Sequence, residues 1–495
     1  MEPCAIGKWI AEHVNEHDLS LDGRLECAAR LFAAGTRLSC APGIGAAGPR
    51  NRDVQLKNPY RLLENAEDLA ATDPQFLYNI ICIALSQLDT NSANLSESGP
   101  FESGEGETLS FSIPADLGGE VFAWRRPFPK WRNILDPASH VDLRNNLRYL
   151  DMVWCHPDQA TYLPMEQQRL RASHRPYGLD DDDGFRIALC PIQAIPRPEF
   201  SLTSNSAGFV VDHDMPSNDG LIREVQATVN LAGGQSVKCI VFPELSIDLC
   251  TRTKLKTFLF DHGKNHPIRQ VVAGSYHDHT QPSQPYLHEA PVLGGTGREL
   301  YRQPKPGLLM LPPEVFPGLP AERSPVPELH RRENAVRVLD TDAGRFAVLV
   351  ASHARCPKVL PFARAARADF LVVVAFSSTP EEFMPVADEL AGMGTSTFFV
   401  RAASALQLEP PASESNRLLA FARLAIAESN TRNIPIWWRF CVGKGVETRS
   451  RNGAWLPIER QHLPIGHALV ESAAPDSPIG MVVDVGAVYK GVYGA

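Results

Sequence analysis

Residues 239–246 read Cys-Ile-Val-Phe-Pro-Glu-Leu-Ser, and this stretch indicates the fold most clearly. Its apolar first half predicts a buried strand, which ends at Pro243 because proline has no backbone N–H for a sheet ladder. Glu244 then stands at the C-terminal end of the strand. A carboxyl group in apolar surroundings has a raised pKa, so Glu244 is a candidate general base. A Pro-Glu pair after a strand is a weak indication when it stands alone.

Apolar runs and amphipathic stretches alternate on both sides of this segment. The runs at 186–191, 270–275, 345–351 and 369–375 predict buried strands, and the spacing at 221–231, 257–262 and 361–367 predicts helices. Buried strands that alternate with helices predict a layered α/β fold.

The chain is too long for a single ordinary core, and residues 180–184, four aspartates followed by glycine, mark the predicted boundary. Residues 1–180 have helical spacing at 25–34, 76–88 and 144–154, with Asp73 as an N-cap of the second helix, which predicts a mainly helical domain. Residues 185–495 form the α/β domain.

The N-terminal region has no assigned function. Aromatic and basic residues alternate at 124–132 and could stack on nucleic-acid bases or dock an acidic protein partner. The simpler interpretation is an irregular segment with packed aromatic rings and surface arginines.

The bulk composition narrows the function classes. A net charge of −9 argues against a nucleic-acid binder in bulk, although it leaves room for a local basic patch. No apolar run approaches the ~20 residues of a membrane span, and the first residues lack an export pattern. The ten cysteines are scattered without a CxxC pair, as is typical of reduced thiols. We therefore expect a cytoplasmic protein with no membrane partner.

Two further segments carry potential chemistry. Residues 297–305 end at Lys305, between prolines, where an ammonium could hold a developing oxyanion; a surface lysine in a proline-rich loop is the alternative. Residues 344–356 read Gly-Arg-Phe-Ala-Val-Leu-Val-Ala-Ser-His-Ala-Arg-Cys and predict a strand, a tight turn and a helix. A thiol at such a turn has a lowered pKa.

In order and spacing, these segments resemble the nitrilase superfamily of carbon–nitrogen hydrolases, which use a Glu-Lys-Cys triad. The resemblance covers residues 185–490, from an opening strand at 185–193, through Phe-Pro-Glu and the Ala-Gly-Ser at 273–275, to a closing strand at 479–485. It implies a four-layer α-β-β-α sandwich, with Glu244 and Lys305 in the triad. It also implies a small-molecule amide or nitrile substrate, no metal, no organic cofactor and a homo-oligomer.

The chain departs from the family at the nucleophile. Counting back from the Ala-Asp strand start at residue 368 places the nucleophile at Ala351, and a methyl group cannot attack a carbonyl. Three explanations remain open. The alanine is an engineered replacement of cysteine, or the domain is a naturally inactive binding or scaffold component of a larger signalling or defence assembly, or the nucleophile is shifted to Ser352 or Cys356.

Weaker candidates complete the predicted site. His353 lies at the turn, Phe376 could wall the acyl pocket or belong to the core, and Glu314 or Glu328 could be the second glutamate that the family often places between its lysine and its nucleophile. The spacing of His277 and His279 can bind a metal, but with no third ligand in view we predict surface or rim histidines.

Overall fold

The structure is a computed structural model that describes part of the 495-residue chain. The described residues are 21–39, 63, 69, 72–93, 110–114, 120–125, 147, 150–155, 169–171, 185–192, 200–203, 208–211, 219–263, 266–278, 286–305, 308–316, 318–320, 322–330, 336–341, 343–350, 368–377, 379–392, 394–403, 405, 418–425, 437–442, 444–449, 454–457, 470–472 and 479–485. The chain divides into two compact units, Met1–Pro164 and Met165–Ala495. The second unit therefore begins before the aspartate run that marks the predicted boundary.

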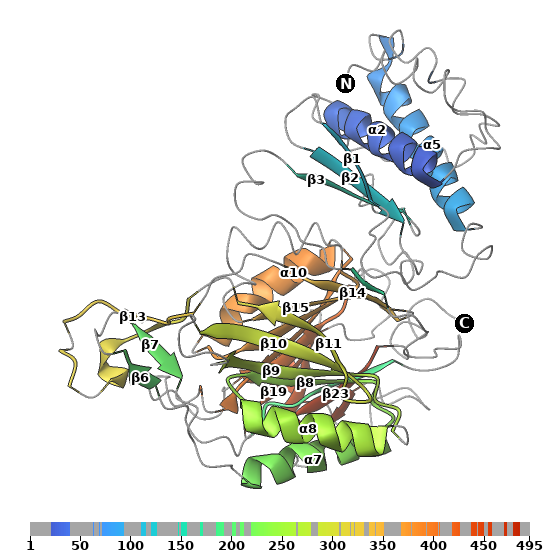
Figure 1. The fold of residues 1–495 in the computed structure, drawn as a ribbon. Helices are drawn as coiled ribbons and strands as arrows, with labels where there is room; N and C mark the ends of the chain where they lie inside the picture. Colours follow the sequence, from blue (N-terminus) through green and yellow to red (C-terminus); the bar gives the residue numbers. More distant parts are fainter. Residues whose placement is uncertain are drawn as a thin grey trace. The chain divides into compact units, whose positions relative to one another are not determined.

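The first unit combines two helices with a small sheet (Figure 1). Its elements are α2 (Leu21–Ser39), α5 (Pro74–Ala93), β1 (Ser110–Pro114), β2 (Glu120–Arg125) and β3 (Leu150–Cys155), with the strands in the antiparallel order β1-β2-β3. Helix α2 packs against α5 and the sheet. The predicted N-cap is present, since the Asp73 side chain accepts a hydrogen bond from the Phe76 amide at 3.0 Å.

The prediction of a helix over 144–154 was wrong for its C-terminal half. Residues 150–155 form β3, and the buried Leu150 and Met152 follow the two-residue period of a strand. Pairing with β2 decides the conformation here. The described residues of this unit are thus of mixed helix and strand, and a mainly helical domain is not confirmed.

The second unit is built on two large sheets, which confirms the predicted α/β class. The seven-stranded sheet has the order β11-β10-β9-β8-β5-β23-β22, and the nine-stranded sheet has the order β21-β20-β19-β18-β17-β16-β15-β14-β4. In chain order the strands are β4 (Arg169–Arg171), β5 (Arg186–Leu189), β8 (Cys239–Glu244), β9 (Gln270–Asp278), β10 (Leu287–Gly294), β11 (Glu299–Pro304), β14 (Val338–Thr341), β15 (Gly344–Val350), β16 (Phe370–Ala375), β17 (Ser396–Arg401), β18 (Leu418–Arg423), β19 (Trp437–Cys441), β20 (Gly445–Arg449), β21 (Trp455–Pro457), β22 (Val470–Ser472) and β23 (Met481–Asp484).

The centre of each sheet is parallel and largely buried. Strands β5, β8 and β9 run parallel in one sheet, and β15, β16 and β17 run parallel in the other. Strand β8 also contacts β16 and β17 across the two sheets. Every residue of β8, β15, β16 and β17 is buried, which explains why these strands are continuous apolar runs in the sequence.

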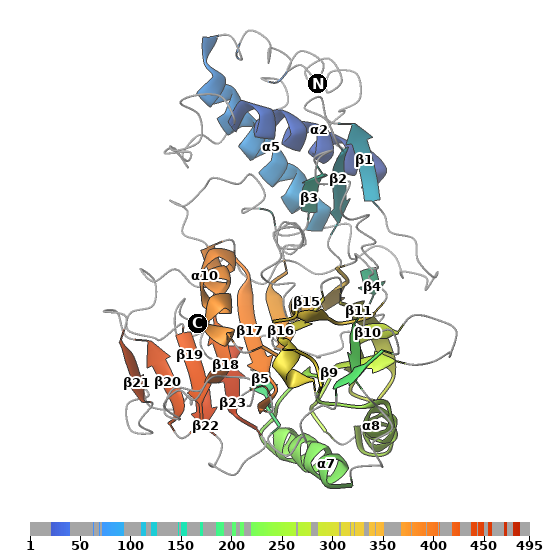
Figure 2. The same cartoon turned by 90° about the vertical axis from the view of Figure 1, so that its left-hand side faces the viewer.

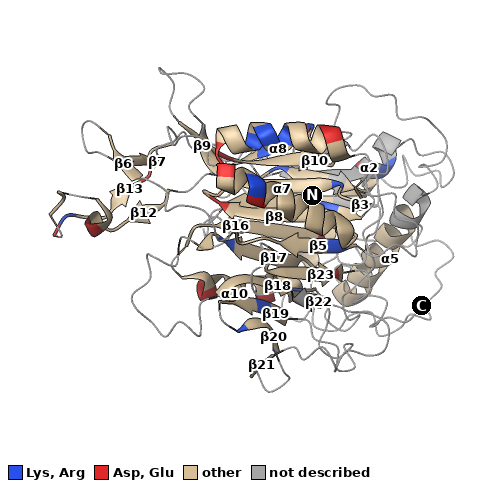
Figure 3. Cartoon of the chain, turned by 90° about the horizontal axis from the view of Figure 1, so that it is seen from below, with Lys and Arg blue, Asp and Glu red and all other residues tan. Residues whose placement is uncertain are grey.

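Helices cover the outer faces of the two sheets. Helices α7 (Asp219–Gly234) and α8 (Leu249–His262) bury Val225 and Leu255 in one apolar cluster with Ile240 and Val271 of the seven-stranded sheet. Helix α10 (Met384–Gly392) packs on β17 and β18, as Figure 2 shows. Figure 3 shows charged residues along α7 and α8 and few on the central strands, as expected when helices separate a buried sheet from water.

A smaller group of short elements lies outside the two large sheets and forms two two-stranded sheets and a 3-10 helix. It comprises β6 (Phe200–Leu202), β7 (Phe209–Val211), β12 (Met310–Leu311), η5 (Pro313–Val315) and β13 (Val326–Pro327). Its aromatic core joins Phe200, Phe209 and Phe316. A bridge between Phe209 and Glu328 connects this group to the residue that follows β13.

No helix in the described part of the chain is both long enough and apolar enough to cross a membrane.

Candidate active site

Glu244 is the last residue of β8, in register with Ser275 of the parallel strand β9. The backbone turns sharply after it: Leu245 has φ 55, and its amide donates to the Ser275 carbonyl at 2.9 Å. A left-handed conformation is costly for leucine, so this hydrogen bond and the packing of the Leu245 side chain must stabilise the turn. Gly274 is needed beside it, because a Cβ at that position would lie 2.3 Å from the Pro243 carbonyl oxygen. The strand pair thus delivers the Glu244 carboxyl group in one fixed position.

Lys305 directly follows β11, and its ammonium joins two carboxylates. Its Nζ lies 2.7 Å from Glu244 Oε1 and 2.7 Å from Glu328 Oε2. All three side chains are 0% exposed. Burial opposes the charged form of Lys305, but the two carboxylates outweigh it and raise the pKa of the lysine. An unpaired charge at this depth would cost several kcal/mol, so the three groups are strongly coupled.

The second oxygen of Glu244 accepts a hydrogen bond from the nine-stranded sheet. Its Oε2 accepts a hydrogen bond from the backbone amide of Phe376, the residue after β16, at 2.6 Å. Burial raises the pKa of Glu244 to about 7, with the Glu328 charge adding to it and Lys305 opposing it. A carboxyl group poised near neutral pH can both accept and return a proton.

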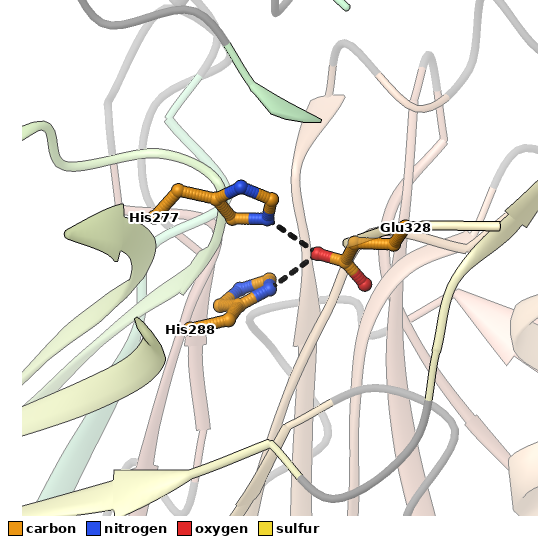
Figure 4. A group of neighbouring side chains, drawn as sticks. All are labelled: His277, His288 and Glu328. Atoms are coloured by element: carbon orange, nitrogen blue, oxygen red, sulfur yellow. Dashed lines mark hydrogen bonds and ion pairs between the residues drawn. The ribbon is translucent and has the colours of Figure 1, made fainter. Parts of the chain in front are cut away.

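Glu328 is surrounded by donors. Figure 4 shows His277 of β9 and His288 of β10 meeting its Oε1, each at 2.5 Å. Its Oε2 accepts from Lys305 and from the Leu309 amide at 2.9 Å. Burial opposes ionisation of Glu328, but Lys305 and the two histidine hydrogen bonds hold its pKa well below the usual range. Glu328 is therefore a carboxylate at neutral pH.

The proton positions on both histidines follow from their partners. The Val211 amide donates to His277 Nδ1 at 3.3 Å, so His277 carries its proton on Nε2 and donates to Glu328. Burial lowers the pKa of His288 well below its usual value, so His288 is neutral. Its Nδ1 donates to the Glu328 carboxylate, which leaves Nε2 to accept from the Ser275 hydroxyl at 2.8 Å.

His330 completes the cluster without binding Glu328. Its Nε2 donates to the Lys305 carbonyl at 2.7 Å, and its Nδ1 stays 3.7 Å from Glu328 Oε2. Burial lowers the pKa of His330 to about 4, so this ring is also neutral at physiological pH.

Three of these residues could also be considered as ligands of a metal ion. Ligand atoms of His277, His288 and Glu328 lie within 4.8 Å of one another. A neutral imidazole that binds metal through one nitrogen carries a proton on the other, which must then donate. At His277 that other nitrogen, Nδ1, faces the Val211 N–H donor instead. The ammonium of Lys305 on the same carboxylate adds a second positive charge. The donor set therefore fits hydrogen bonds better than a metal.

The structure brings Glu244, Lys305, Glu328 and Phe376 together. Glu314 is exposed on η5 and is not part of this buried cluster. Phe376 is buried in an apolar cluster with Leu245, and its backbone amide contacts the site. The prediction of a surface or rim position for His277 was wrong, since its side chain is 0% exposed; His279 lies outside the described residues.

The predicted nucleophile position follows strand β15. Ala351, Ser352, His353 and Cys356 lie outside the described residues. The described chain ends at Val350 of β15, which is in register with Val374 of β16, two positions before Phe376. The C-terminal end of β15 therefore lies at the sheet edge where the Phe376 amide meets Glu244.

Four contributors were missed from the sequence: Ser275, His277 as a site residue, His288 and His330. His277 and His288 are cross-strand partners in the antiparallel pair of β9 and β10. A hairpin between residues 270 and 294 with histidines on facing positions was the available signal. His330 has no comparable signal, because its place depends on the loop after β13.

Comparison with known proteins gives a weak likeness to one group of solved structures. No family model matches the chain, and no curated protein matches it. An amidase from Nesterenkonia sp. is 16% identical and covers 61% of this chain and 90% of its own, with a TM-score of 0.35. Nit3 of Saccharomyces cerevisiae, a member of branch 10 of the nitrilase superfamily, is 12% identical and covers 49% of this chain and 83% of its own, with a TM-score of 0.34. At such values the chemistry of the site rests on the chain's own residues.

Proposed function

We propose that residues 185–490 form a nitrilase-type carbon–nitrogen hydrolase domain of the amidase kind, in which Glu244 is the general base and Lys305 the oxyanion-binding cation. The observation that carries the proposal is the fully buried Lys305 between two carboxylates, one of which has a pKa of about 7. Burying three charged side chains costs free energy, and such a cluster with a shifted carboxyl pKa is typical of a functional site. The packing of α7 and α8 on one sheet and α10 on the other supports the four-layer α-β-β-α sandwich.

The chemistry requires a thiol at position 351. The thiol would attack the carbonyl carbon of a small amide while Glu244 takes its proton. An ammonium has three N–H donors, and carboxylates among the described residues use two of those on Lys305, so the third can hold the oxyanion. Protonated Glu244 then gives its proton to the departing amine, which leaves a thioester. Glu244 next activates water to hydrolyse the thioester, and the thiol is restored.

The chain carries alanine at position 351, so we propose that it binds substrate without turnover. This observation also favours a second function, a non-catalytic nitrilase-like module that serves as a binding or scaffold component. The retained Glu244–Lys305–Glu328 cluster favours the hydrolase, because a site without chemistry has little physical reason to keep three buried charges.

The test is the Ala351→Cys variant. We expect the new thiol to react with chloroacetamide on the order of 10-fold faster than the exposed Cys250 of α8, which serves as the internal reference. Adding Glu244→Gln should remove most of that advantage, and ammonia release from small amides should follow the same order. A new thiol that reacts no faster than Cys250 would leave the non-catalytic module as the better reading.

A further inference from the structure

We propose that His277 and His288 are positioning residues that act through Glu328: as neutral donors they keep Glu328 ionised, so that Glu244 is the carboxyl group of the pair that exchanges a proton. The inference rests on the proposed role of Glu244 as general base. Both histidines are fully buried on neighbouring strands and converge on one oxygen of Glu328.

The charge balance of the cluster determines that one of the two carboxyl groups takes up a proton. With both carboxylates ionised, one ammonium faces two negative charges, and the buried cluster has a net charge of −1. A buried net charge is relieved when one carboxyl group takes up a proton. Glu244 and Glu328 compete for that proton, since each lies 2.7 Å from the same Lys305 Nζ.

The hydrogen-bond donors around each carboxylate determine which of the two takes up the proton. Glu328 accepts four hydrogen bonds, from His277, His288, Lys305 and the Leu309 amide. A proton on Glu328 would turn one acceptor into a donor and set it against these partners. From the described residues, Glu244 accepts two, from Lys305 and the Phe376 amide, so protonation disturbs fewer of these bonds.

Two hydrogen bonds lock the histidines as donors. The Val211 N–H can only donate, so it leaves His277 with its proton on Nε2, facing Glu328. The Glu328 carboxylate can only accept, so it places the His288 proton on Nδ1, and the Ser275 hydroxyl supports this arrangement by donating to Nε2. His288 Nε2 lies 3.6 Å from Glu244 Oε1, too far for a hydrogen bond to compete with Ser275.

The other charged and titratable neighbours in the described part of the chain do not supply this effect. Among the described residues, the groups that face Glu328 besides the two histidines are Lys305 after β11, Glu244 of β8 and His330 after β13. Lys305 acts on both carboxylates at equal distance. His330 is committed to the Lys305 carbonyl and is neutral. The difference between the carboxylates therefore falls to His277, His288 and the Leu309 amide.

The test is an infrared titration of protonated carboxyl groups from pH 6 to 8.5, where exposed carboxyl groups are already ionised. In the unmodified chain we expect a protonated-carboxyl band that fades around pH 7, and Glu244→Gln should abolish it. In His288→Leu and in His277→Leu, we expect Glu328 to share the proton. The shared proton should then add a second C=O stretching frequency, from Glu328, to the single band of the unmodified chain.

Matched variants distinguish the loss of a hydrogen-bond donor to Glu328 from the loss of side-chain packing. An asparagine amide can stand in for the Nδ1 donor of His288, and a glutamine amide for the Nε2 donor of His277. His288→Asn and His277→Gln should therefore restore the single Glu244 titration, while His288→Leu and His277→Leu should not. Thermal unfolding of each variant checks that it is folded. If a leucine variant fails to fold, His277→Phe or His288→Phe, which keeps a ring at the position but removes the donor, takes its place.

Two results would overturn the inference. One is a leucine variant whose band keeps the single C=O frequency of the unmodified chain. The other is a protonated-carboxyl band that persists after Glu244→Gln is introduced into the otherwise unmodified chain. The titration uses the chain with alanine at position 351, so it can succeed while the Ala351→Cys test of the hydrolase proposal fails.

Discussion

The surroundings of Glu244 and of Glu328 differ, although one ammonium joins the two side chains. Among the described residues, two groups donate to Glu244, which lies between the two sheets, and burial raises its pKa to about 7. Four described groups donate to Glu328, which lies beside the β9–β10 pair, and its pKa stays well below the usual range in spite of equal burial. Burial alone therefore does not decide the charge of a carboxyl group. The number and kind of its hydrogen-bond donors decide it.

The largest effect is expected from Lys305→Met, which removes the partner that both carboxylates share. Two buried carboxyl groups then lack their counter-charge, and we expect the free energy of unfolding to fall by about 3–5 kcal/mol. Urea unfolding at pH 7 measures this. The control is Lys256→Met, which breaks a pair with Glu299 whose side chains are 32% and 25% exposed. It should cost at most about 1 kcal/mol. Equal losses in the two variants would contradict the coupling.

The next effect distinguishes the two carboxylates directly. Glu328→Gln places an amide N–H₂ among four donors, while Glu244→Gln disturbs only two. We expect Glu328→Gln to lower the free energy of unfolding by about 3 kcal/mol at pH 7, and Glu244→Gln to lower it less, because a missing partner for buried polar groups costs about 1–3 kcal/mol each. Both variants are measured by the same urea titration. A greater loss for Glu244→Gln would reverse the comparison.

The pH dependence of stability sharpens the same difference. The pKa of Glu244 rises on folding from 4.5 to about 7, so the folded state binds more protons in that range. Stability then decreases as pH rises from about 4.5 to about 7, by on the order of 3 kcal/mol from this group. Glu328 has the opposite sign, since its lowered pKa stabilises the fold above the unfolded pKa and that contribution is lost as pH falls. Subtracting the unfolding curves of Glu244→Gln from those of the unmodified chain isolates the first contribution. A flat difference would contradict the raised pKa.

The smallest effect is expected from Ser275→Ala. The change leaves His288 Nε2 without its donor, so the locked proton position is loosened but Glu328 keeps all its partners. We expect a loss of about 1 kcal/mol in the free energy of unfolding. Thr253→Ala, which removes an exposed hydroxyl bond to the Leu249 carbonyl, is the control and should change stability by less than about 0.5 kcal/mol.

Local pattern was sufficient for the central strands. The apolar runs that became β8, β9, β15 and β16 are recognisable because a parallel strand buried on both faces must be apolar along its whole length. The same reasoning was wrong for residues 150–155, where pairing with β2 and not local periodicity set the conformation. Short segments with mixed spacing depend on their neighbours in space.

The sequence by itself determined the α/β class and the position of Glu244 at the end of a buried strand, because each follows from residues close together in the chain. Only the tertiary structure decided which second glutamate joins Glu244 and Lys305. Glu328 lies 23 residues from Lys305 and 84 from Glu244, and the turns between them carry no pattern that measures distance in space. The structure also decided the states of the two carboxyl groups, since the donors that set them come from β9, β10, the residue after β16 and the segment between β11 and β12.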